Sequence, residues 1–229
     1  MIKSEIINNT AIITLNRPEK RNALHSFMVE QIKLNLKEFT NDDNVRSLII
    51  TGEGNTFCAG ADLEYLQKLS NNTSIENYDD SKSLAEMFLM IYEFPKPTIA
   101  SVNGSAIAGG CGLASVCDFI IAHPEKSKFG YSEVKIGFIP AIVSIFLIKK
   151  VGEGIAKQLL LEGDRISGQR AYEIGFVNYL SENVFQEALS LTEKLNKSSL
   201  QSIKQTKQMI NQISNLSVRE AVNHCITLM

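Results

Sequence analysis

Apolar and polar positions alternate along this chain in blocks whose spacing distinguishes strands from helices. Short apolar runs next to turn-forming residues predict buried strands at residues 11–15, 45–50, 98–102 and 119–122. Between the first two runs, Phe27, Ile32, Leu36 and Phe39 recur at helical spacing among polar residues, which predicts an amphipathic helix over 26–39. Further helices are expected at 63–69, capped by Asp62, and at 81–93. This alternation of strands and helices predicts an α/β fold.

The pattern changes after Pro140, where nearly every segment favours helix. Helices are expected at 142–151, 154–161, 169–174, 184–196, 200–213 and from 218 onward, with an extended piece at 175–180. The polar stretch 70–80 predicts a mobile loop over a binding cleft. We expect a core over 1–180 and a C-terminal helical segment over 181–229. Because the last residues stop in mid-helix without a cap, that segment is expected to be shortened.

Composition and charge narrow the class of protein. With 44% hydrophobic and 21% charged residues and a net charge of −2, neither disorder nor nucleic-acid binding is indicated. The apolar runs are too short for a membrane span, and no signal-peptide pattern begins the chain. The four cysteines lack metal-ligand spacing and a dense disulfide pattern, and the three histidines are scattered. We therefore expect a cytoplasmic protein with reduced thiols, no metal site and no membrane contact.

The stretch 99–140 carries the candidate chemistry. A strand leads into a small-residue turn, and a helix then begins on Gly109 and Gly110. Glycines at a helix start allow close approach to unpaired N–H groups, which favour an oxygen that gains negative charge. A second small-residue turn lies at 57–62, and Glu133 supplies a carboxylate within an apolar, small-residue setting. Glycine pairs also permit tight helix packing and most glutamates are solvated, but the combination favours a site that polarises a carbonyl and moves a proton.

Several motifs occur in order and together carry a resemblance to a known family. They are NRPEKRNAL at 16–24, FCAGADL at 57–63, GGCGLA at 109–114, FGYSE at 129–133, GFIP at 137–140 and AYEIGFV at 171–177. Each is weak alone, but their order and spacing make the set specific. The chain resembles the crotonase family, the enoyl-CoA hydratases and isomerases, over nearly its whole length.

The resemblance implies a crotonase-like α/β spiral of β-β-α units with a helical C-terminal region, assembled as homotrimers or as hexamers made of two trimers. It implies an acyl-CoA thioester as substrate, in fatty acid or branched-chain amino acid metabolism, and no metal or other cofactor, since CoA is part of the substrate. The thioester oxygen would lie between the N–H groups of Ala59 and Gly109, with Glu133 as the catalytic acid and base. Lys20 or Arg21 would lie near a phosphate. The residues implied to line the CoA path are Lys20, Ala23, Ala61, Asp62 and Leu63.

One position departs from the family pattern. Many hydratases of this family carry two glutamates, and the first falls at Gly112 here. Glu133 alone could move both protons through one water, giving a hydratase; it could shuttle a proton along the acyl chain, giving a double-bond isomerase; or the chain could be a catalytically impaired CoA-thioester-binding protein. The missing side chain is expected to leave room for a branched or carboxylated acyl group, and the surrounding residues resemble methylglutaconyl-CoA hydratase-like members. Our leading hypothesis is an acyl-CoA hydro-lyase.

Overall fold

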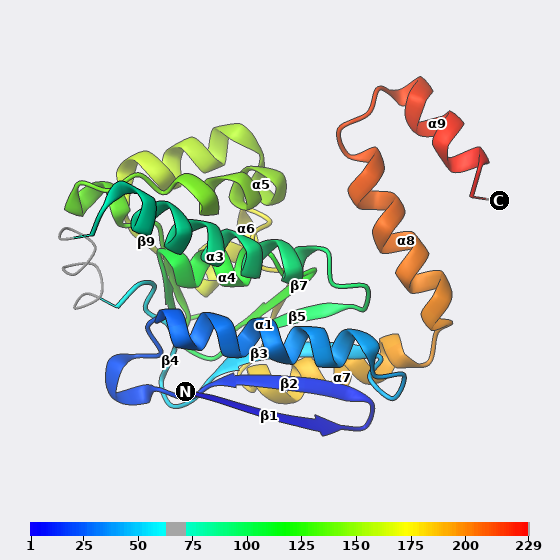
Figure 1. Cartoon of the computed structure of the whole chain (residues 1–229), viewed down its shortest axis with the longest axis horizontal. Helices are drawn as coiled ribbons and strands as arrows, with labels where there is room; N and C mark the ends of the chain where they lie inside the picture. The colour runs from blue at the N-terminus through cyan, green and yellow to red at the C-terminus, as the bar shows by residue number, and fades with distance from the viewer. Residues whose placement is uncertain (63–71, 229) are drawn as a thin grey trace.

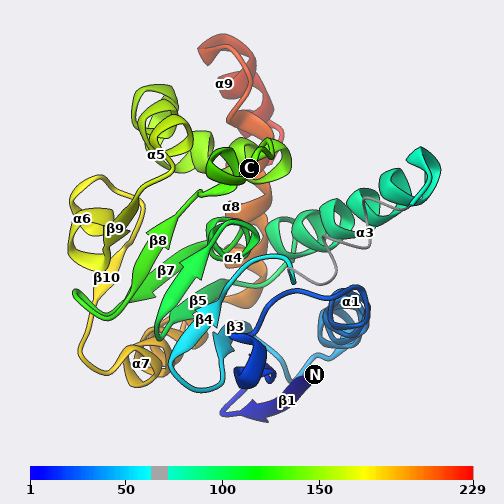
Figure 2. The same ribbon diagram turned by 90° about the vertical axis from the view of Figure 1, so that its left-hand side faces the viewer.

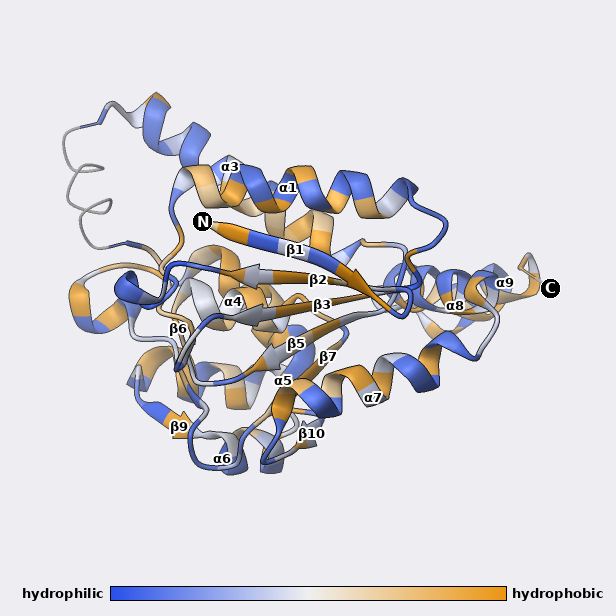
Figure 3. Ribbon diagram, turned by 90° about the horizontal axis from the view of Figure 1, so that it is seen from below, coloured by the Kyte–Doolittle hydropathy of each residue, from blue (hydrophilic) through white to orange (hydrophobic). Residues whose placement is uncertain are grey.

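The computed structural model describes residues 1–62 and 72–228, and the larger of its two sheets has six strands. In spatial order these are β1 (Ile2–Ile7), β2 (Thr10–Leu15), β3 (Ser47–Gly52), β5 (Thr98–Val102), β7 (Phe119–Ala122) and β10 (Tyr179–Leu180). β1 pairs antiparallel with β2, and every other pairing in this sheet is parallel. The inner strands are apolar over most of their length, whereas β1 is mixed (Figure 3). Parallel strands buried on both faces explain the near-continuous apolar runs in the sequence.

A second sheet is built from short continuations of these strands. Its order is β4 (Thr56–Cys58), β6 (Ser105–Ile107), β8 (Lys128–Gly130) and β9 (Arg165–Ser167). β3 leads into β4, β5 into β6 and β7 into β8, so the chain repeats a pair of strands with a turn between them, and a helix follows. The predicted α/β spiral of β-β-α units with a helical C-terminal region is confirmed. Strands of three residues were not predicted, because they are too short to show a periodic pattern.

Helices cover both faces of the larger sheet. They are α1 (Ser26–Asn41), α3 (Ser74–Tyr92), α4 (Gly109–Ser115), α5 (Ala141–Glu162), α6 (Gly168–Glu173) and α7 (Val184–Asn196), with short 3-10 turns η1 (Pro18–Lys20) and η2 (Glu133–Ile136). Ile13 and Ile50 belong to the main core with α1, α3, α4 and α5, whereas the neighbouring Ile12 and Ile49 belong to a second cluster with α7. This alternation follows from the two-residue period of strands. Figure 2 shows α4 near the centre, with α1, α3 and α5 around it.

The predicted loop over 70–80 is wrong from residue 74 onward, because α3 begins there. Thr73 and Glu76 form a capping box: the Glu76 carboxylate accepts from the Thr73 N–H at 2.8 Å, and the Thr73 hydroxyl accepts from the Glu76 N–H at 3.3 Å. This cap satisfies helix-end donors in a polar sequence that lacks an apolar stripe. The predicted helix at 63–69 lies outside the described residues. α5 is interrupted at Gly152 (φ 75°), which agrees with the two helices expected there.

Two helices at the C-terminal end, α8 (Leu200–Ile213) and α9 (Val218–Ile226), stand apart from the rest of the molecule (Figure 1). Neither contains a buried residue, and apolar side chains such as Ile210 and Val222 are exposed. An ion pair between Lys207 and Asp118, 2.7 Å long, ties α8 to the body. Within the described ranges, no helix combines the length and the apolar character needed to cross a membrane.

Candidate active site

The first candidate donor lies in the turn after β4, where Leu24 and Ala61 form an isolated parallel bridge. The Leu24 N–H donates to the Gly60 carbonyl at 2.7 Å, and the Asp62 N–H donates to the Leu24 carbonyl at 3.2 Å. N–H groups of consecutive residues in an extended segment point in opposite directions. The N–H of Ala61 therefore points away from Leu24, and it has no hydrogen-bond partner in the part of the chain that the structure describes.

The second candidate donor is Gly109, the first residue of α4. The N–H of Ala108 donates to the Gly130 carbonyl at 2.8 Å, whereas the N–H of Gly109 has no partner among residues 1–62 and 72–228. The first N–H groups of a helix lack intrahelical acceptors and carry the positive end of its dipole. The Gly109 N–H is therefore free, within the described residues, to donate to an oxygen atom of another molecule.

The two donor segments lie directly against each other. A Cβ added to Gly109 would be 3.7 Å from the Gly60 Cα, and a Cβ added to Gly60 would be 3.3 Å from the Gly109 nitrogen. Gly60 also adopts φ +86°, and its added Cβ would come within 2.7 Å of the Ile107 carbonyl oxygen. Only glycine meets both demands at position 60. This contact brings the amides of Ala61 and Gly109 together.

The prediction that Ala59 provides the first donor is wrong in this structure. Its N–H already donates to the Arg21 carbonyl at 3.0 Å, an acceptor presented by a residue in the left-handed region (φ 51°). Ala59 and Ala61 are two residues apart in the same small-residue turn, so the sequence alone did not separate them. Ala61, expected only along the CoA path, is the residue with the unpaired amide.

Arg17 and Asn22 hold this turn in place, and sequence reasoning assigned neither a role. The Arg17 guanidinium contacts the Asp62 carboxylate at 2.6 Å, with side chains only 13% and 6% exposed. The Asn22 side chain accepts from the Arg17 N–H at 2.9 Å and donates to the Glu53 and Thr56 carbonyls at 2.9 and 2.7 Å. Both residues lie inside the NRPEKRNAL motif, which was the available signal. Asp62, expected along the CoA path, is buried and paired from inside the turn.

Glu133 begins η2, three residues after the end of β8. The preceding strand, β8, is held against α4 by two hydrogen bonds of Gly130. The Gly130 N–H donates to the Cys111 sulfur at 3.2 Å, and the Gly130 carbonyl accepts from the Ala108 N–H. The Glu133 carboxyl is half-buried, and this burial raises its pKa above the ordinary value. Its Oε2 atom is fully shielded and has no hydrogen-bond partner within the described residues. Glu133 is thus a carboxyl with a raised pKa near Cys111 of α4, and its Oε2 atom lacks a partner within the described residues.

Two buried groups near Glu133 respond to its charge. Burial is the main cause that raises the pKa of the Cys111 thiol and the pKa of the Tyr131 phenol, and the Glu133 carboxylate raises both further. The Cys111 thiol donates a hydrogen bond to the Ala106 carbonyl at 2.8 Å. Both side chains are therefore neutral packing groups under ordinary conditions, as expected for buried thiols and phenols.

The predicted free space at Gly112 does not exist. A Cβ added to Gly112 would overlap the Val143 Cγ1 and would lie 3.1 Å from the Phe88 Cζ. Val143 comes from the first turn of α5 and Phe88 from α3, and both are buried. The expectation failed because a missing side chain leaves room only where the neighbouring elements stay in place, and interiors close around small residues.

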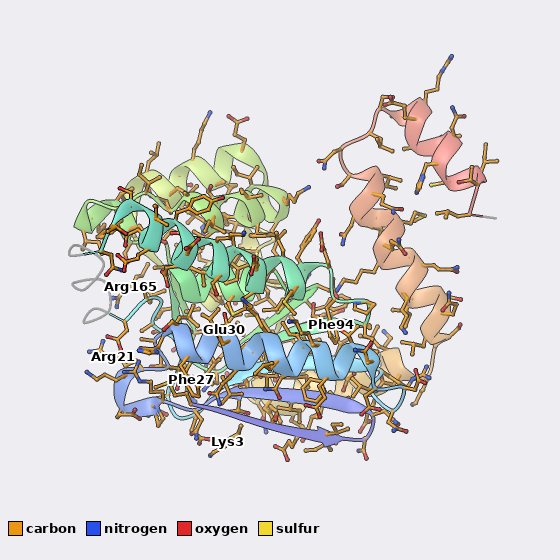
Figure 4. All side chains as sticks on the ribbon, viewed as in Figure 1. Lys3, Arg21, Phe27, Glu30, Phe94 and Arg165 are labelled. Carbon is orange, nitrogen blue, oxygen red and sulfur yellow. The ribbon has the colours of Figure 1, made fainter. Side chains whose placement is uncertain are left out.

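The remaining residues predicted to contact CoA differ in exposure, and one of them lies outside the described chain. Lys20 and Arg21 are exposed in and just after η1, and Figure 4 shows Arg21 at the opposite end of α1 from Phe94. Ala23 is buried, and Leu63 lies outside the described residues. Among the described residues, no three histidine, cysteine or carboxylate side chains gather as metal ligands would.

Comparisons with known proteins agree with this arrangement. A family model described as enoyl-CoA hydratase/isomerase matches residues 5–226. The mitochondrial enoyl-CoA hydratase of Pongo abelii is 35% identical over 93% of this chain and 72% of its own length. The short-chain-enoyl-CoA hydratase of Clostridium acetobutylicum is 33% identical over 88% and 77%. The crystal structure of an enoyl-CoA hydratase from Polaromonas sp. JS666 superposes with a TM-score of 0.92 at 32% identity, over 97% of this chain and 87% of that one. The chain belongs to the enoyl-CoA hydratase/isomerase family.

Proposed function

We propose that this enzyme adds water to, and removes it from, α,β-unsaturated acyl-CoA thioesters. The observation that carries the proposal is the pair of amides at Ala61 and Gly109, which lack partners among the described residues and are brought together by the Gly60–Gly109 contact. Glu133, whose shielded Oε2 has no hydrogen-bond partner in the described part of the chain, supplies the acid and base. The relatives of Pongo abelii and Clostridium acetobutylicum, named as enoyl-CoA hydratases, support the same reaction.

In the proposed mechanism the thioester oxygen binds between the two amides. When water adds to the β-carbon, this oxygen gains enolate character, so both hydrogen bonds strengthen in the transition state. Glu133 accepts a proton from the water and returns one to the α-carbon. Burial raises the pKa of this carboxyl toward neutral pH. A group whose pKa lies nearer the working pH both accepts and releases a proton efficiently. CoA is part of the substrate, and the proposed chemistry uses no further cofactor.

A Glu133→Gln variant tests this assignment. The amide keeps the size of the side chain and removes its proton chemistry, so we expect kcat for crotonyl-CoA hydration to fall about 10²- to 10⁴-fold. Glu38→Gln, on the exposed face of α1, is the matched control and should keep parental activity. Equal hydration rates for the Glu133 variant and the parent would refute the catalytic role.

A double-bond isomerase is the second candidate, and a specific observation favours it. Residue 112 is a glycine, so Glu133 has no second carboxylate at that position. Val143 and Phe88 fill the space that a side chain there would need. One carboxylate is sufficient to carry a proton between the α- and γ-carbons. The parent enzyme in deuterated water separates the two reactions: hydration gives a hydroxyacyl product, whereas isomerisation moves the double bond and exchanges α-protons without adding water. Tight binding without either product would indicate a CoA-thioester-binding protein.

We also propose that the enzyme works in the cytoplasm as a homotrimer or as two paired trimers. Ile210, Val218, Val222 and Ile226 expose apolar surface on α8 and α9. A groove of about 310 Å³ between α8 and the body adds Phe119 and Ile203 to this surface. Exposed apolar surface of this kind favours association between copies. The proposed cytoplasmic location is supported by the four free thiols, which fit a reducing compartment. Sedimentation analysis tests the assembly, and a monomer at micromolar concentration would contradict it.

A further inference from the structure

The space next to Gly112 is closed by two apolar side chains from different helices. A Cβ at residue 112 would overlap the Val143 Cγ1 atom, and the Phe88 Cζ and Cε2 atoms would lie 3.1 and 3.2 Å from that Cβ. Val143 is 6% exposed and Phe88 is fully buried. A carboxylate at position 112 would therefore displace packed apolar atoms, because the three atoms nearest to a Cβ there are all hydrocarbon.

Each of these side chains is held by its own surroundings. The Phe88 ring packs edge-on against Phe146, with centroids 6.3 Å apart and planes at 79°. Such edge-to-face contacts add to the stability that burial provides and restrict the ring. Val143 belongs to the first turn of α5, and the β-branched side chain has few rotamers in a helix. Val143 and Phe88 together form a rigid apolar surface, which is called the wall below.

The wall lies close to the proposed reacting atoms. Gly112 follows Gly109 by three residues in α4, which is about 4.5 Å along the helix axis. The segment that carries Glu133 leads directly into α5, so Val143 follows the catalytic carboxyl by ten residues on adjoining elements. An acyl chain whose carbonyl oxygen binds at Gly109 would therefore begin within one helical turn of Gly112, the residue that Val143 and Phe88 enclose.

We infer that Val143 and Phe88 determine acyl specificity and select a short, straight, apolar acyl group. Two physical reasons support this selection: an additional methylene would overlap packed atoms, and a distal carboxylate would be buried against hydrocarbon without a partner. The inference rests on the proposed function and replaces the expectation of a branched or carboxylated acyl group.

The test is a Val143→Ala variant assayed with crotonyl-CoA and trans-2-hexenoyl-CoA. Removing two methyl groups opens the wall, and hydrophobic pockets discriminate single methylenes by about 10- to 200-fold. We expect the ratio of kcat/KM for hexenoyl-CoA to that for crotonyl-CoA to rise about 10-fold, mainly through a lower KM for the longer substrate. Val184→Ala is the matched control, because Val184 is also 6% exposed but packs in the cluster with α7. Its ratio should equal that of the parent.

A second readout does not depend on turnover. The same variants are titrated with the saturated thioesters butyryl-CoA and hexanoyl-CoA, and Val143→Ala should shift the ratio of their Kd values toward hexanoyl-CoA by a similar factor. If neither enoyl-CoA reacts with any variant or parent, the proposed function fails while this ratio still tests the wall. A Val143→Ala protein with both ratios unchanged overturns the inference. Phe88→Leu, which shortens the other half of the wall, serves if Val143→Ala does not fold.

Discussion

The helix α4 and the helical pair α8–α9 show opposite relations between sequence and structure. α4 has seven residues, three of them glycine, and all but its first residue are buried. α8 and α9 carry Ser caps at both starts and have no buried residue. Each glycine within a helix costs about 1 kcal/mol relative to alanine, so the local sequence of α4 opposes helix formation.

This difference shows where each helix obtains its stability. α4 exists because the surrounding body holds it: a Cβ on Gly110 would overlap the Cys58 carbonyl, and Cys111 bonds to Ala106 and Gly130. Its glycines allow the close approach of neighbouring backbone, as at Gly110, at the expense of helix propensity. α8 and α9 are specified locally by caps and apolar spacing, and they contribute little buried surface. Substitutions in α4 should therefore affect activity and folding strongly, whereas those in α9 should not.

Among substitutions in these two regions, the largest effect is expected for Gly109→Pro, which removes the proposed donor. Proline is tolerated at the first position of a helix, so the fold should persist. Loss of one oxyanion donor typically costs about 10²- to 10³-fold in kcat. Steady-state kinetics with crotonyl-CoA measures the loss. Ser26→Pro, the same change at the first residue of α1 on an exposed surface, should leave kcat unchanged. Parental kcat in the Gly109 variant would exclude this amide from the site.

The next effect concerns packing under α4. Gly110→Ala forces a Cβ into the Cys58 carbonyl and Cβ, and overpacking of this kind costs about 1–3 kcal/mol of unfolding free energy. Gly154→Ala provides the contrast, because an added Cβ there meets no atom within 4 Å and alanine favours the helix by up to about 1 kcal/mol. Urea denaturation measures both. Equal unfolding free energies for the Gly110→Ala and Gly154→Ala proteins would show that α4 can shift to accommodate the added Cβ.

A smaller, pH-dependent effect follows from Glu133. Its folded-state pKa is raised by burial, so the folded chain binds more protons than the unfolded chain between the two pKa values. The stability of the parent should fall as the pH rises through that window, which begins near the ordinary value of about 4.3. Glu133→Gln lacks this penalty, so its advantage in unfolding free energy should increase with pH. A difference that stays flat or reverses would contradict the burial of this carboxyl.

The smallest effect on folding is expected in α9. Val222 is 54% exposed, so Val222→Gln should change the unfolding free energy by less than about 0.5 kcal/mol. The same variant should lower the assembled mass in sedimentation, because it places an amide within the apolar face proposed to meet another copy. A large loss of stability in an isolated subunit would show that α9 belongs to the core after all.

The same contrast explains how much could be predicted from the sequence. α7 and α8 match their predicted bounds, because caps and apolar spacing act within a few residues. The start of α3 was missed because its signal is the single pair Thr73 and Glu76. At the candidate site the glycines of α4 and the acid Glu133 could be identified, but the choice between Ala59 and Ala61 depends on which N–H meets the Arg21 carbonyl. The filling of the space at Gly112 likewise depends on α3 and α5, which are distant in sequence.

The contact between Arg17 and Asp62 has a consequence for how binding energy is used. It joins the end of the second strand to the turn that carries the Ala61 amide, and both side chains are almost completely enclosed. The amide is thus set in position when the protein folds, before any thioester arrives. Ordering this turn therefore requires none of the binding free energy from the nucleotide part of the substrate. That binding free energy can lower the activation barrier instead.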